Sequence, residues 1–271
     1  MVLPCRMVAM ISASIRRKNH MPFQPIIQRF DSIGSTNLEA MSQARVGAPE
    51  GVCIVARQQT RGRGRLDRSW QSPTDAGLYM SLILRPKFEI NMWPLITLMA
   101  ALAVYDALMK ACALQADIKW PNDLCVDDRK LCGILAETVE TASGPAAVLG
   151  IGINLTSEIL PLVPAEATSV ESVTGRKPDV ELVLHELLKS IAERYDFLQN
   201  AAGGEHTIRE WCAHSSYAVG RRVRVTLSGE TFEGTTRGLE RDGALRVETA
   251  DGKMRIVRAG DVTALRSTRI D

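Results

Sequence analysis

Three runs of this sequence are almost entirely apolar, and they limit the folds that the chain can adopt. Leu78–Leu84, Leu131–Val139 and Ala147–Ile153 are each close to continuous in apolar residues. Such runs are typical of strands that are buried on both faces of a sheet. Pro94–Ala113 is apolar almost all round and begins with proline at a first-turn position, which predicts a buried helix. Together the runs predict a sheet that is covered by helices.

Two further helices and a strand complete the predicted body of the chain. Ser35-Thr36-Asn37 carries side chains that favour the start of a helix. Val52–Ala56 has the composition of a short strand that follows Gly51. Apolar residues recur along one stripe of Val180–Leu198, which predicts a helix with one buried face.

The pattern of the sequence changes at Gly220. Four short alternating segments follow, separated by Ser-Gly or Asp-Gly turns: Arg222–Leu227, Thr231–Arg237, Ala244–Thr249 and Met254–Val257. Alternation between such turns predicts a small antiparallel barrel. We therefore expect an N-terminal extension over residues 1–24, an α+β body over residues 25–217 and a barrel domain over residues 220–271.

Charge and composition exclude several classes of protein. The chain has 33 Lys and Arg against 31 Asp and Glu, and residues 1–30 hold five basic residues and no acidic one. Residues 31–271 therefore hold 28 basic and 31 acidic residues, which argues against general nucleic-acid binding. Hydrophobic residues make up 45% of the chain, which excludes a largely disordered protein.

Cysteine usage and the longest apolar helix bear on location. The six cysteines include no C-x-x-C pair, which favours a reducing compartment. The apolar stretch Leu95–Tyr105 is interrupted by Thr97 and ended by Asp106, whereas a membrane-spanning helix needs about 20 apolar residues. We therefore expect no membrane association and predict a cytoplasmic protein.

The segment Gln59–Trp70 has no apolar periodicity, which predicts a loop. Its centre reads Gly62-Arg63-Gly64-Arg65. Glycines let backbone N–H groups approach a ligand closely, and guanidinium groups suit carboxylate and phosphate oxygens. The segment is either an anion-binding loop that becomes ordered around its ligand or a solvated basic loop, including one that contacts RNA.

A second polar cluster is Lys119-Trp120-Pro121-Asn122-Asp123, followed by Lys130 at the start of a buried strand. Asn122 and Asp123 offer oxygens of the kind that hold Mg²⁺ together with substrate phosphates. Packing around the strand would fix the ammonium group of Lys130. The alternative interpretation is an ordinary Pro-Asn-Asp turn.

The third cluster is Gly150-Ile151-Gly152-Ile153-Asn154. It is not a dinucleotide-binding fingerprint, because Leu155 stands where the third glycine belongs. Its small residues either let a ligand lie against the strand backbone or allow the strand to pack tightly.

Taken in order, these segments resemble the biotin protein ligase family. The matching pieces are Ser35-Thr36-Asn37, Gln59-Thr60-x-Gly62-Arg63-Gly64-Arg65, Lys119-Trp120-Pro121-Asn122-Asp123, Lys130-Leu131-x-Gly133-Ile134-Leu135 and Gly150-x-Gly152-Ile153-Asn154. The resemblance implies an α+β catalytic domain with a mixed sheet, followed by an SH3-like barrel. It also implies that ATP and biotin form biotinyl-5′-AMP with release of pyrophosphate, and that a lysine of biotin carboxyl carrier protein then takes the biotinyl group.

The resemblance also implies roles for individual residues. The expected catalytic residues are Arg63, Arg65 and Lys130. The expected biotin-binding residues are Ser35, Thr36, Asn37, Gln59, Arg63, Gly64, Arg65, Lys130, Gly133 and Gly152. The expected ATP- or adenylate-binding residues are Arg65, Arg68, Trp70, Lys119, Asn122 and Asn154, and Asp123 would bind Mg²⁺.

The chain departs from the family pattern in two places. Asp67 stands where the family loop usually has glycine, which adds a negative charge near the expected phosphates. Only about 25–30 residues precede the body, too few for the winged helix-turn-helix of bifunctional members. We therefore expect a ligase that does not bind operator DNA.

Two alternative functions stay open at this point. Lipoate-protein ligases and octanoyl transferases resemble this family in the catalytic domain. A non-enzymatic RNA-binding module would use the Arg-rich loop and the barrel, which has nine basic and six acidic residues in 220–258. Aromatic residues are only 5% of the chain, which disfavours base stacking. The sequence leaves both a monomer and a homodimer open.

Overall fold

The three apolar runs form the centre of a seven-stranded sheet in the computed structural model, which describes residues 24–265. The elements of the body are β1 (Ile26–Phe30), α1 (Thr36–Arg45), β2 (Val52–Ala56), β3 (Gly77–Leu84), η1 (Ile90–Met92), α2 (Pro94–Cys112), β4 (Asp117–Lys119), β5 (Asp123–Val126), β6 (Arg129–Val139), β7 (Ala146–Asn154), η2 (Ser157–Leu162), α3 (Val170–Thr174), α4 (Val180–Leu198) and α5 (Gly203–Ala213). The sheet order is β1-β2-β3-β7-β6-β5-β4. Only β1 and β2 pair in parallel among these described strands, so the sheet is mixed as expected.

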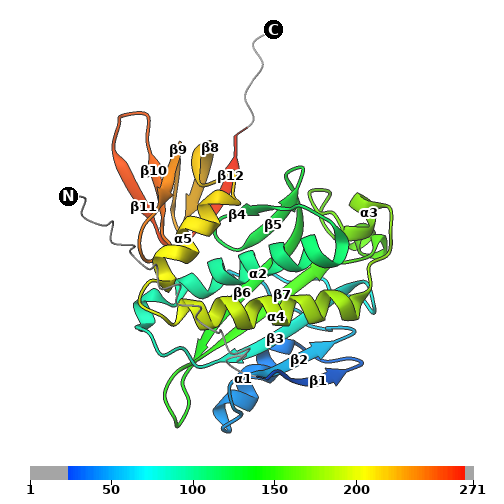
Figure 1. Ribbon diagram of the computed structural model, residues 1–271. Helices are drawn as coiled ribbons and strands as arrows, with labels where there is room; N and C mark the ends of the chain where they lie inside the picture. Colours follow the sequence, from blue (N-terminus) through cyan, green and yellow to red (C-terminus); the bar gives the residue numbers. More distant parts are fainter. Residues whose placement is uncertain (1–23, 266–271) are drawn as a thin grey trace, which may run out of the picture.

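Helices cover both faces of this sheet. On β2, Cys53 and Val55 belong to the large core that includes α2 and α4, whereas Val52 and Ile54 pack with Ala40 of α1. This division follows from the two-residue period of a strand, which sends successive side chains to opposite faces. Every residue of β2, β3 and β7 is buried, which explains their continuous apolar character. Figure 1 shows α2 and α4 side by side over one face of the sheet.

The predicted buried helix is confirmed as α2. The apolar stretch that contains it is longer than the eleven residues considered in the sequence analysis. Ile90–Cys112 is long and apolar enough to cross a membrane by length and composition alone, which corrects the expectation based on Leu95–Tyr105. In the structure α2 packs against β6, α4 and α5, and eleven of its 19 residues are buried. A core helix meets the same criterion, so packing accounts for this composition.

A five-stranded antiparallel sheet follows the body, as the alternating segments predict. Its strands are β8 (Val219–Leu227), β9 (Glu230–Leu239), β10 (Leu245–Glu248), β11 (Met254–Val257) and β12 (Asp261–Ala264), in the order β11-β10-β9-β8-β12. Gly229, Gly243 and Gly252 have φ values of 84°, 83° and 78°, which tight turns of this kind require. Within the described residues β11 and β12 form the two edges, so the sheet is not closed into the predicted barrel.

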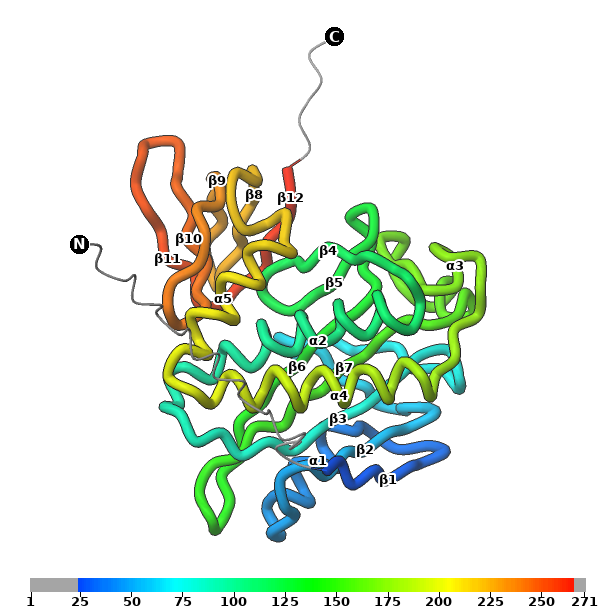
Figure 2. The backbone as a smooth tube through the Cα atoms, in the orientation of Figure 1, coloured from blue at the N-terminus to red at the C-terminus, as the bar shows by residue number. Residues whose placement is uncertain are grey.

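The small sheet is fixed against the β4–β5 hairpin of the body. The buried indole Nε1 of Trp120 donates to the carbonyl of Gly243 at 3.0 Å. Arg221, at the start of the small sheet, is paired with Asp128 at 3.0 Å. Figure 2 shows the small sheet at one end of the body. Asp261 of β12 accepts from Arg68, which brings the C-terminal part of the described chain close to the Gln59–Trp70 segment.

Several short elements were not predicted from the sequence. They are the strands β1, β4, β5 and β12 and the helices α3 and α5. The four strands and α3 have only three to five residues each, too few for a clear apolar period, and neighbouring elements supply most of their stabilisation. The sequence interpretation missed α5 although Thr207 and Trp211 are buried four residues apart on one face of it. Lys130 was expected to precede a buried strand, and it lies one residue inside β6.

Candidate functional site

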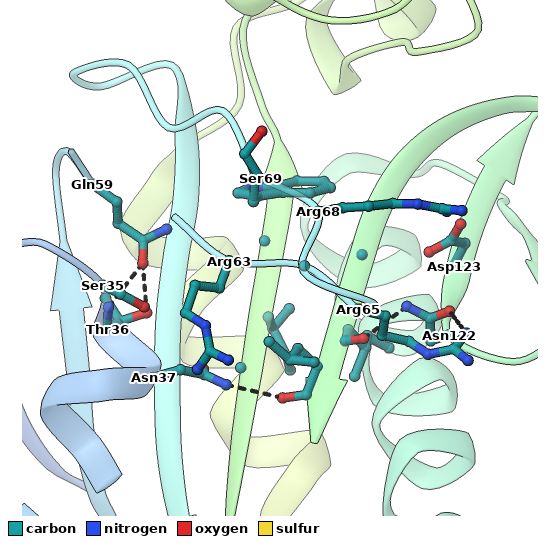
Figure 3. Close-up of a pocket in the computed structure, with 18 of the residues that line it drawn as sticks. Ser35, Thr36, Asn37, Gln59, Arg63, Arg65, Arg68, Ser69, Asn122 and Asp123 are labelled. Carbon is teal, nitrogen blue, oxygen red and sulfur yellow. Dashed lines mark hydrogen bonds between the residues drawn. The ribbon is translucent and has the colours of Figure 1, made fainter. Parts of the chain in front are cut away.

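A cavity of about 130 Å³ lies over the central strands, between the N-terminus of α1 and the Gln59–Trp70 segment (Figure 3). Fourteen of the predicted site residues line it: Ser35, Thr36, Asn37, Gln59, Arg63, Gly64, Arg65, Arg68, Trp70, Asn122, Asp123, Lys130, Gly133 and Gly152. Seven further residues line it that were not assigned: Ser69, Met80, Ile134, Leu135, Gly150, Ile151 and Asp261. The motifs therefore converge on one cavity although they are spread over more than a hundred residues of sequence.

Two predicted residues do not line this cavity. The Nζ atom of Lys119 lies 5.9 Å from the ring centroid of Tyr217, on the side of the small sheet. Asn154 is buried, and its Nδ2 donates to the carbonyl of Thr168 at 3.0 Å. Its Oδ1 has no hydrogen-bond partner among the described residues. The nucleotide-binding roles of Lys119 and Asn154 stay predictions.

The Gln59–Trp70 segment is a compact hairpin, whereas the sequence predicted only an irregular loop. The N–H of Gly64 donates to the carbonyl of Arg68 at 2.7 Å and closes the turn. Leu66 and Asp67 at its tip have φ values of 54° and 56°, in the left-handed region. Aspartate tolerates this region better than most residues, which accounts for Asp67 at the tip of the hairpin.

Each of the three arginines that line the cavity is held by a different structural element. Arg63 is paired with Glu137 of β6, Arg65 donates to Asn122 between β4 and β5, and Arg68 is paired with Asp261 of β12. The hairpin is therefore fixed to strand β6 and the β4–β5 turn of the body and to strand β12 of the small sheet. Because these contacts are long-range, the partner of each arginine could not be predicted from the sequence.

One end of the cavity is cationic. Arg65 Nη1 donates to Asn122 Oδ1 at 2.9 Å, and Lys130 Nζ lies 2.7 Å from Asp123 Oδ1 (Figure 3 labels Arg65, Asn122 and Asp123). Burial lowers the pKa of the Arg65 guanidinium, because the charged form has lost water. A bound anion would replace that lost solvation, so this end is suited to carboxylate or phosphate oxygens.

The other end of the cavity carries neutral polar groups. Gln59 Oε1 accepts from the N–H of Thr36 at 2.8 Å and from its hydroxyl at 3.0 Å, and Gln59 Nε2 donates to Ser72 at 2.8 Å. Ser35 occupies the N-cap position of α1, yet its side chain makes no capping hydrogen bond. The buried Ser35 hydroxyl has no partner among the described residues. An incoming polar ligand would satisfy it.

At three glycines of the motifs, the space that a Cβ atom would take is occupied by another side chain of the protein. A Cβ atom on Gly152 would lie 2.5 Å from the Trp70 indole, and one on Gly133 would lie 2.9 Å from it. A Cβ atom on Gly150 would lie 2.0 Å from Asn37 Oδ1. Tight packing, one of the two alternatives for this cluster, therefore accounts for Gly150 and Gly152. Trp70 forms an apolar wall of the cavity above the two strands.

Glu137 and Asp261 were missed by the sequence interpretation although both bind arginines of the hairpin. Glu137 is the one acidic residue in the apolar run Leu131–Val139, and a carboxylate in such a run generally needs a partner. That signal would have found it. Asp261 carries no comparable signal, because it lies in a short strand 193 residues from Arg68.

Comparisons with known proteins match both parts of the chain. A model of the biotin/lipoate A/B protein ligase family matches residues 30–154, and a model of the biotin protein ligase C terminal domain matches residues 218–263. The chain is 36% identical over 235 residues to the bifunctional ligase/repressor BirA of Bacillus spizizenii, covering 84% of this chain and 71% of that protein. It is 34% identical over 239 residues to the biotin–[acetyl-CoA-carboxylase] ligase of Mycobacterium tuberculosis, covering 86% of each.

The fold is also similar to a solved structure, the biotin protein ligase from Aquifex aeolicus in complex with biotin and ATP. The TM-score is 0.76 at 28% sequence identity, and the match covers 90% of this chain and 100% of that chain. The ordered motifs, the single cavity that they line, and the sequence matches over most of each relative agree. The chain therefore belongs to the biotin protein ligase family.

Proposed function

We propose that this protein is a biotin–[acetyl-CoA-carboxylase] ligase that attaches biotin to a lysine of biotin carboxyl carrier protein in two steps. In the first step the biotin carboxylate attacks the α-phosphate of ATP, which gives biotinyl-5′-AMP and pyrophosphate. In the second step the neutral lysine amine attacks the acyl carbon, which gives the amide and AMP. The observation that carries this proposal is a cavity with Arg65 and Lys130 at one end and, at the other, a Ser35 hydroxyl that has no hydrogen-bond partner within residues 24–265.

The shape and polarity of the cavity match those of biotin. Biotin has a neutral ureido group at one end, a carboxylate at the other and an apolar ring and chain between them. The Ser35 hydroxyl and the Gln59 amide would bind the ureido group, which loses its water on entry. Trp70 supplies an apolar surface of the cavity, over the backbone of Gly133 and Gly152. Arg65 and Lys130 would then meet the carboxylate.

The cationic end addresses the main electrostatic obstacle of the first step. A carboxylate and a triphosphate repel each other, and in a site of low dielectric constant this repulsion is worth several kcal/mol. Cations that are already in place lower the barrier, because no further reorganisation is needed when the charge shifts. Arg65 and Lys130 are held by Asn122 and Asp123, so both are in place. Arg68 is exposed and would exchange Asp261 for a phosphate oxygen.

Mg²⁺ would accompany the nucleotide. Within residues 24–265 no group of three or more His, Cys, Asp or Glu is arranged to hold a metal ion. Mg²⁺ in phosphoryl and nucleotidyl chemistry is commonly held by one or two carboxylates together with substrate phosphates. Asp123 in the cavity fits such a role, and the ion would neutralise phosphate charge there.

The thiols support a cytoplasmic location for this activity. The five cysteines of the described region are all free, and three of them are buried. Burial raises the pKa of Cys53 to about 12, since the thiolate would lose its water, and it does the same for Cys125. Such thiols are inert in packing roles and are compatible with a reducing compartment.

A lipoate ligase or an octanoyl transferase is disfavoured by the neutral polar end of the cavity. A dithiolane ring or a plain acyl chain would leave the Ser35 hydroxyl unpaired, whereas a site built around hydrogen bonds rejects a ligand that cannot make them. The Arg-rich hairpin also binds partners within the chain, which weakens the case for a solvated RNA-binding loop.

The decisive experiment combines pyrophosphate exchange with mass spectrometry of a carrier domain. We expect exchange of pyrophosphate into ATP that depends on biotin, and a biotinyl adduct on one carrier lysine after incubation with biotin and MgATP. Lipoate and octanoate, tested in parallel, should support neither. Exchange that follows lipoate in place of biotin would overturn the proposal.

A further inference from the structure

The carboxylate of Glu137 joins three parts of the chain and binds two residues that line the cavity, Asn37 and Arg63. It lies on β6, and its Oε2 accepts from Asn37 Nδ2 at 2.9 Å. Arg63 Nη1 lies 3.1 Å from each of its two oxygens. The side chain of Glu137 is 21% exposed and that of Arg63 is 35% exposed, so the contact is partly shielded from water. One carboxylate therefore connects the sheet, the start of α1 and the Arg-rich hairpin.

Asn37 has no free donor to offer a ligand, because the protein uses both of its N–H groups. Its Nδ2 donates to the carbonyl of Leu135 at 3.3 Å as well as to Glu137, and its Oδ1 accepts from the Ser81 hydroxyl at 2.5 Å. An amide side chain has two N–H donors, so this set exhausts them. Gly150 leaves the space that the Asn37 amide occupies. Asn37 is therefore a connection within the protein.

Arg63 is likewise committed to a protein partner. Figure 3 places it beside Asn37, in the middle of the cavity wall, away from Arg65 and Asn122. Arg63 Nη1 contacts both oxygens of the Glu137 carboxylate, whereas Arg65 Nη1 donates to the neutral amide oxygen of Asn122. The two arginines of the Gly62-Arg63-Gly64-Arg65 motif thus do different work.

We propose that Glu137 is a positioning residue that holds Arg63 and Asn37, and thereby fixes residues 62–64 of the hairpin against the N-terminus of α1. This proposal rests on the ligase function proposed above. In it, Arg63 maintains the shape of the biotin pocket and does not bind the reacting anions. Arg65 and Lys130 serve the anions. Loss of the Glu137 carboxylate consequently weakens biotin binding and leaves the chemical step largely intact.

Kinetics of the variants Glu137→Gln, Arg63→Gln and the double variant test this assignment. Each single change should raise the KM for biotin about tenfold in pyrophosphate exchange, because one charge-assisted bond is lost. The KM for ATP and the kcat should change less than about threefold, and the double variant should be no worse than the poorer single variant. Glu233→Gln is the matched control, since Glu233 forms a comparable pair with Arg224 on the small sheet at 2.7 Å.

Hydrogen exchange supplies a readout that does not depend on activity. Amide exchange at residues 62–64 should be faster in Glu137→Gln than in the wild type, with little change along α4. Slow exchange there in the variant, or additive losses in kcat for Arg63→Gln and Glu137→Gln, would show that Arg63 acts on the anions and that Glu137 does not position it. If Glu137→Gln does not fold, Arg63→Gln alone tests the proposal. A raised KM for biotin with little change in kcat would support it, and a large loss in kcat would overturn it. If the wild type shows no biotin-dependent pyrophosphate exchange, the proposed function is overturned instead. Amide hydrogen exchange at residues 62–64 would still test the positioning role of Glu137.

Discussion

The indole ring of Trp70 lies so close to the backbone of Gly152 that a Cβ atom there would be 2.5 Å from its Nε1. The same ring covers Gly133 on the neighbouring strand β6, where a Cβ atom would be 2.9 Å away. Gly133 and Gly152 are paired directly opposite each other in the sheet, and their lack of side chains leaves the space that the Trp70 indole occupies. The position of Trp70 as a wall of the cavity therefore depends on these two glycines.

Gly152→Ala should displace Trp70 and impair biotin binding. Overpacking of this kind costs roughly 1–3 kcal/mol, so we expect the KM for biotin to rise about 10- to 100-fold. Gly34→Ala is the control, because a Cβ atom at Gly34 meets no atom within 4 Å. Steady-state pyrophosphate exchange measures both variants. An unchanged KM in Gly152→Ala would mean that the indole does not shape the pocket.

Lys130→Ala should slow adenylate formation strongly while leaving the fold almost intact. The Lys130 ammonium lies 2.7 Å from Asp123 at the cationic end, and its side chain is 37% exposed. Removal of one preorganised charge from a transition state typically costs about 10²- to 10³-fold in kcat. A pair this exposed contributes about 1 kcal/mol or less to stability. Single-turnover formation of biotinyl-5′-AMP and urea unfolding separate the two effects.

The matched control for this change is Lys110→Ala on α2, where the ammonium lies 3.9 Å from Glu186 and far from the cavity. That variant should keep full activity. A Lys130→Ala protein that forms adenylate at the rate of Lys110→Ala would remove Lys130 from the reaction.

The sequence predicts the strands and helices that have strong patterns, and it misses those that depend on neighbours. The continuous apolar runs at β3 and β7 are predicted correctly because both strands are buried along their whole length, which leaves no room for polar residues. The run at β6 was also expected to be buried on both faces, but this strand has half-buried and exposed positions and carries Glu137. β4 has three residues and β12 has four, too few for a period to be visible. They exist because β5 and β8 offer them open edges.

The candidate site follows the same division. Motif residues such as Ser35 and Lys130 were predicted to act together, and the structure brings them to one cavity. Asp261 was not predicted, because only the docking of the small sheet brings it to Arg68. The reason for glycine at positions 133 and 152 could not be predicted either, because no sequence pattern indicates that Trp70 packs against them. Local patterns thus identify chemistry, while partners are set by tertiary structure.

Binding of biotin should slow hydrogen exchange in the Arg-rich hairpin. The hairpin is held by a few backbone hydrogen bonds, such as Gly64 N–H to Arg68 carbonyl at 2.7 Å, and by side chains that are partly exposed. Such elements open at low free-energy cost, whereas a bound ligand adds contacts that must break first. We expect slower exchange over residues 60–70 with biotin, more so with biotin and MgATP. Equal exchange with and without ligand would argue against closure of the hairpin over the adenylate.

Stability in acid should depend on Asp106, which joins α2 to α4. Burial alone would raise the pKa of this carboxyl, but hydrogen bonds from Arg194 and Ser190, both at 2.6 Å, outweigh burial and hold the pKa below its ordinary value. Folding thus favours the ionised form, so the contribution is complete above the unfolded pKa near 4 and is lost as the pH falls below it. Asp106→Asn should cost roughly 2 kcal/mol at pH 7, as expected for hydrogen bonds to a charged group.

Urea unfolding at pH 7 and at about pH 3 tests this dependence, because protonated Asp106 resembles asparagine. The difference in unfolding free energy between the wild type and Asp106→Asn should be large at pH 7 and should shrink in acid. Asp196→Asn, on the exposed face of α4, is the control and should show little difference at either pH. A difference for Asp106→Asn that is the same at both pH values would mean that the ionised carboxylate does not stabilise the contact between α2 and α4.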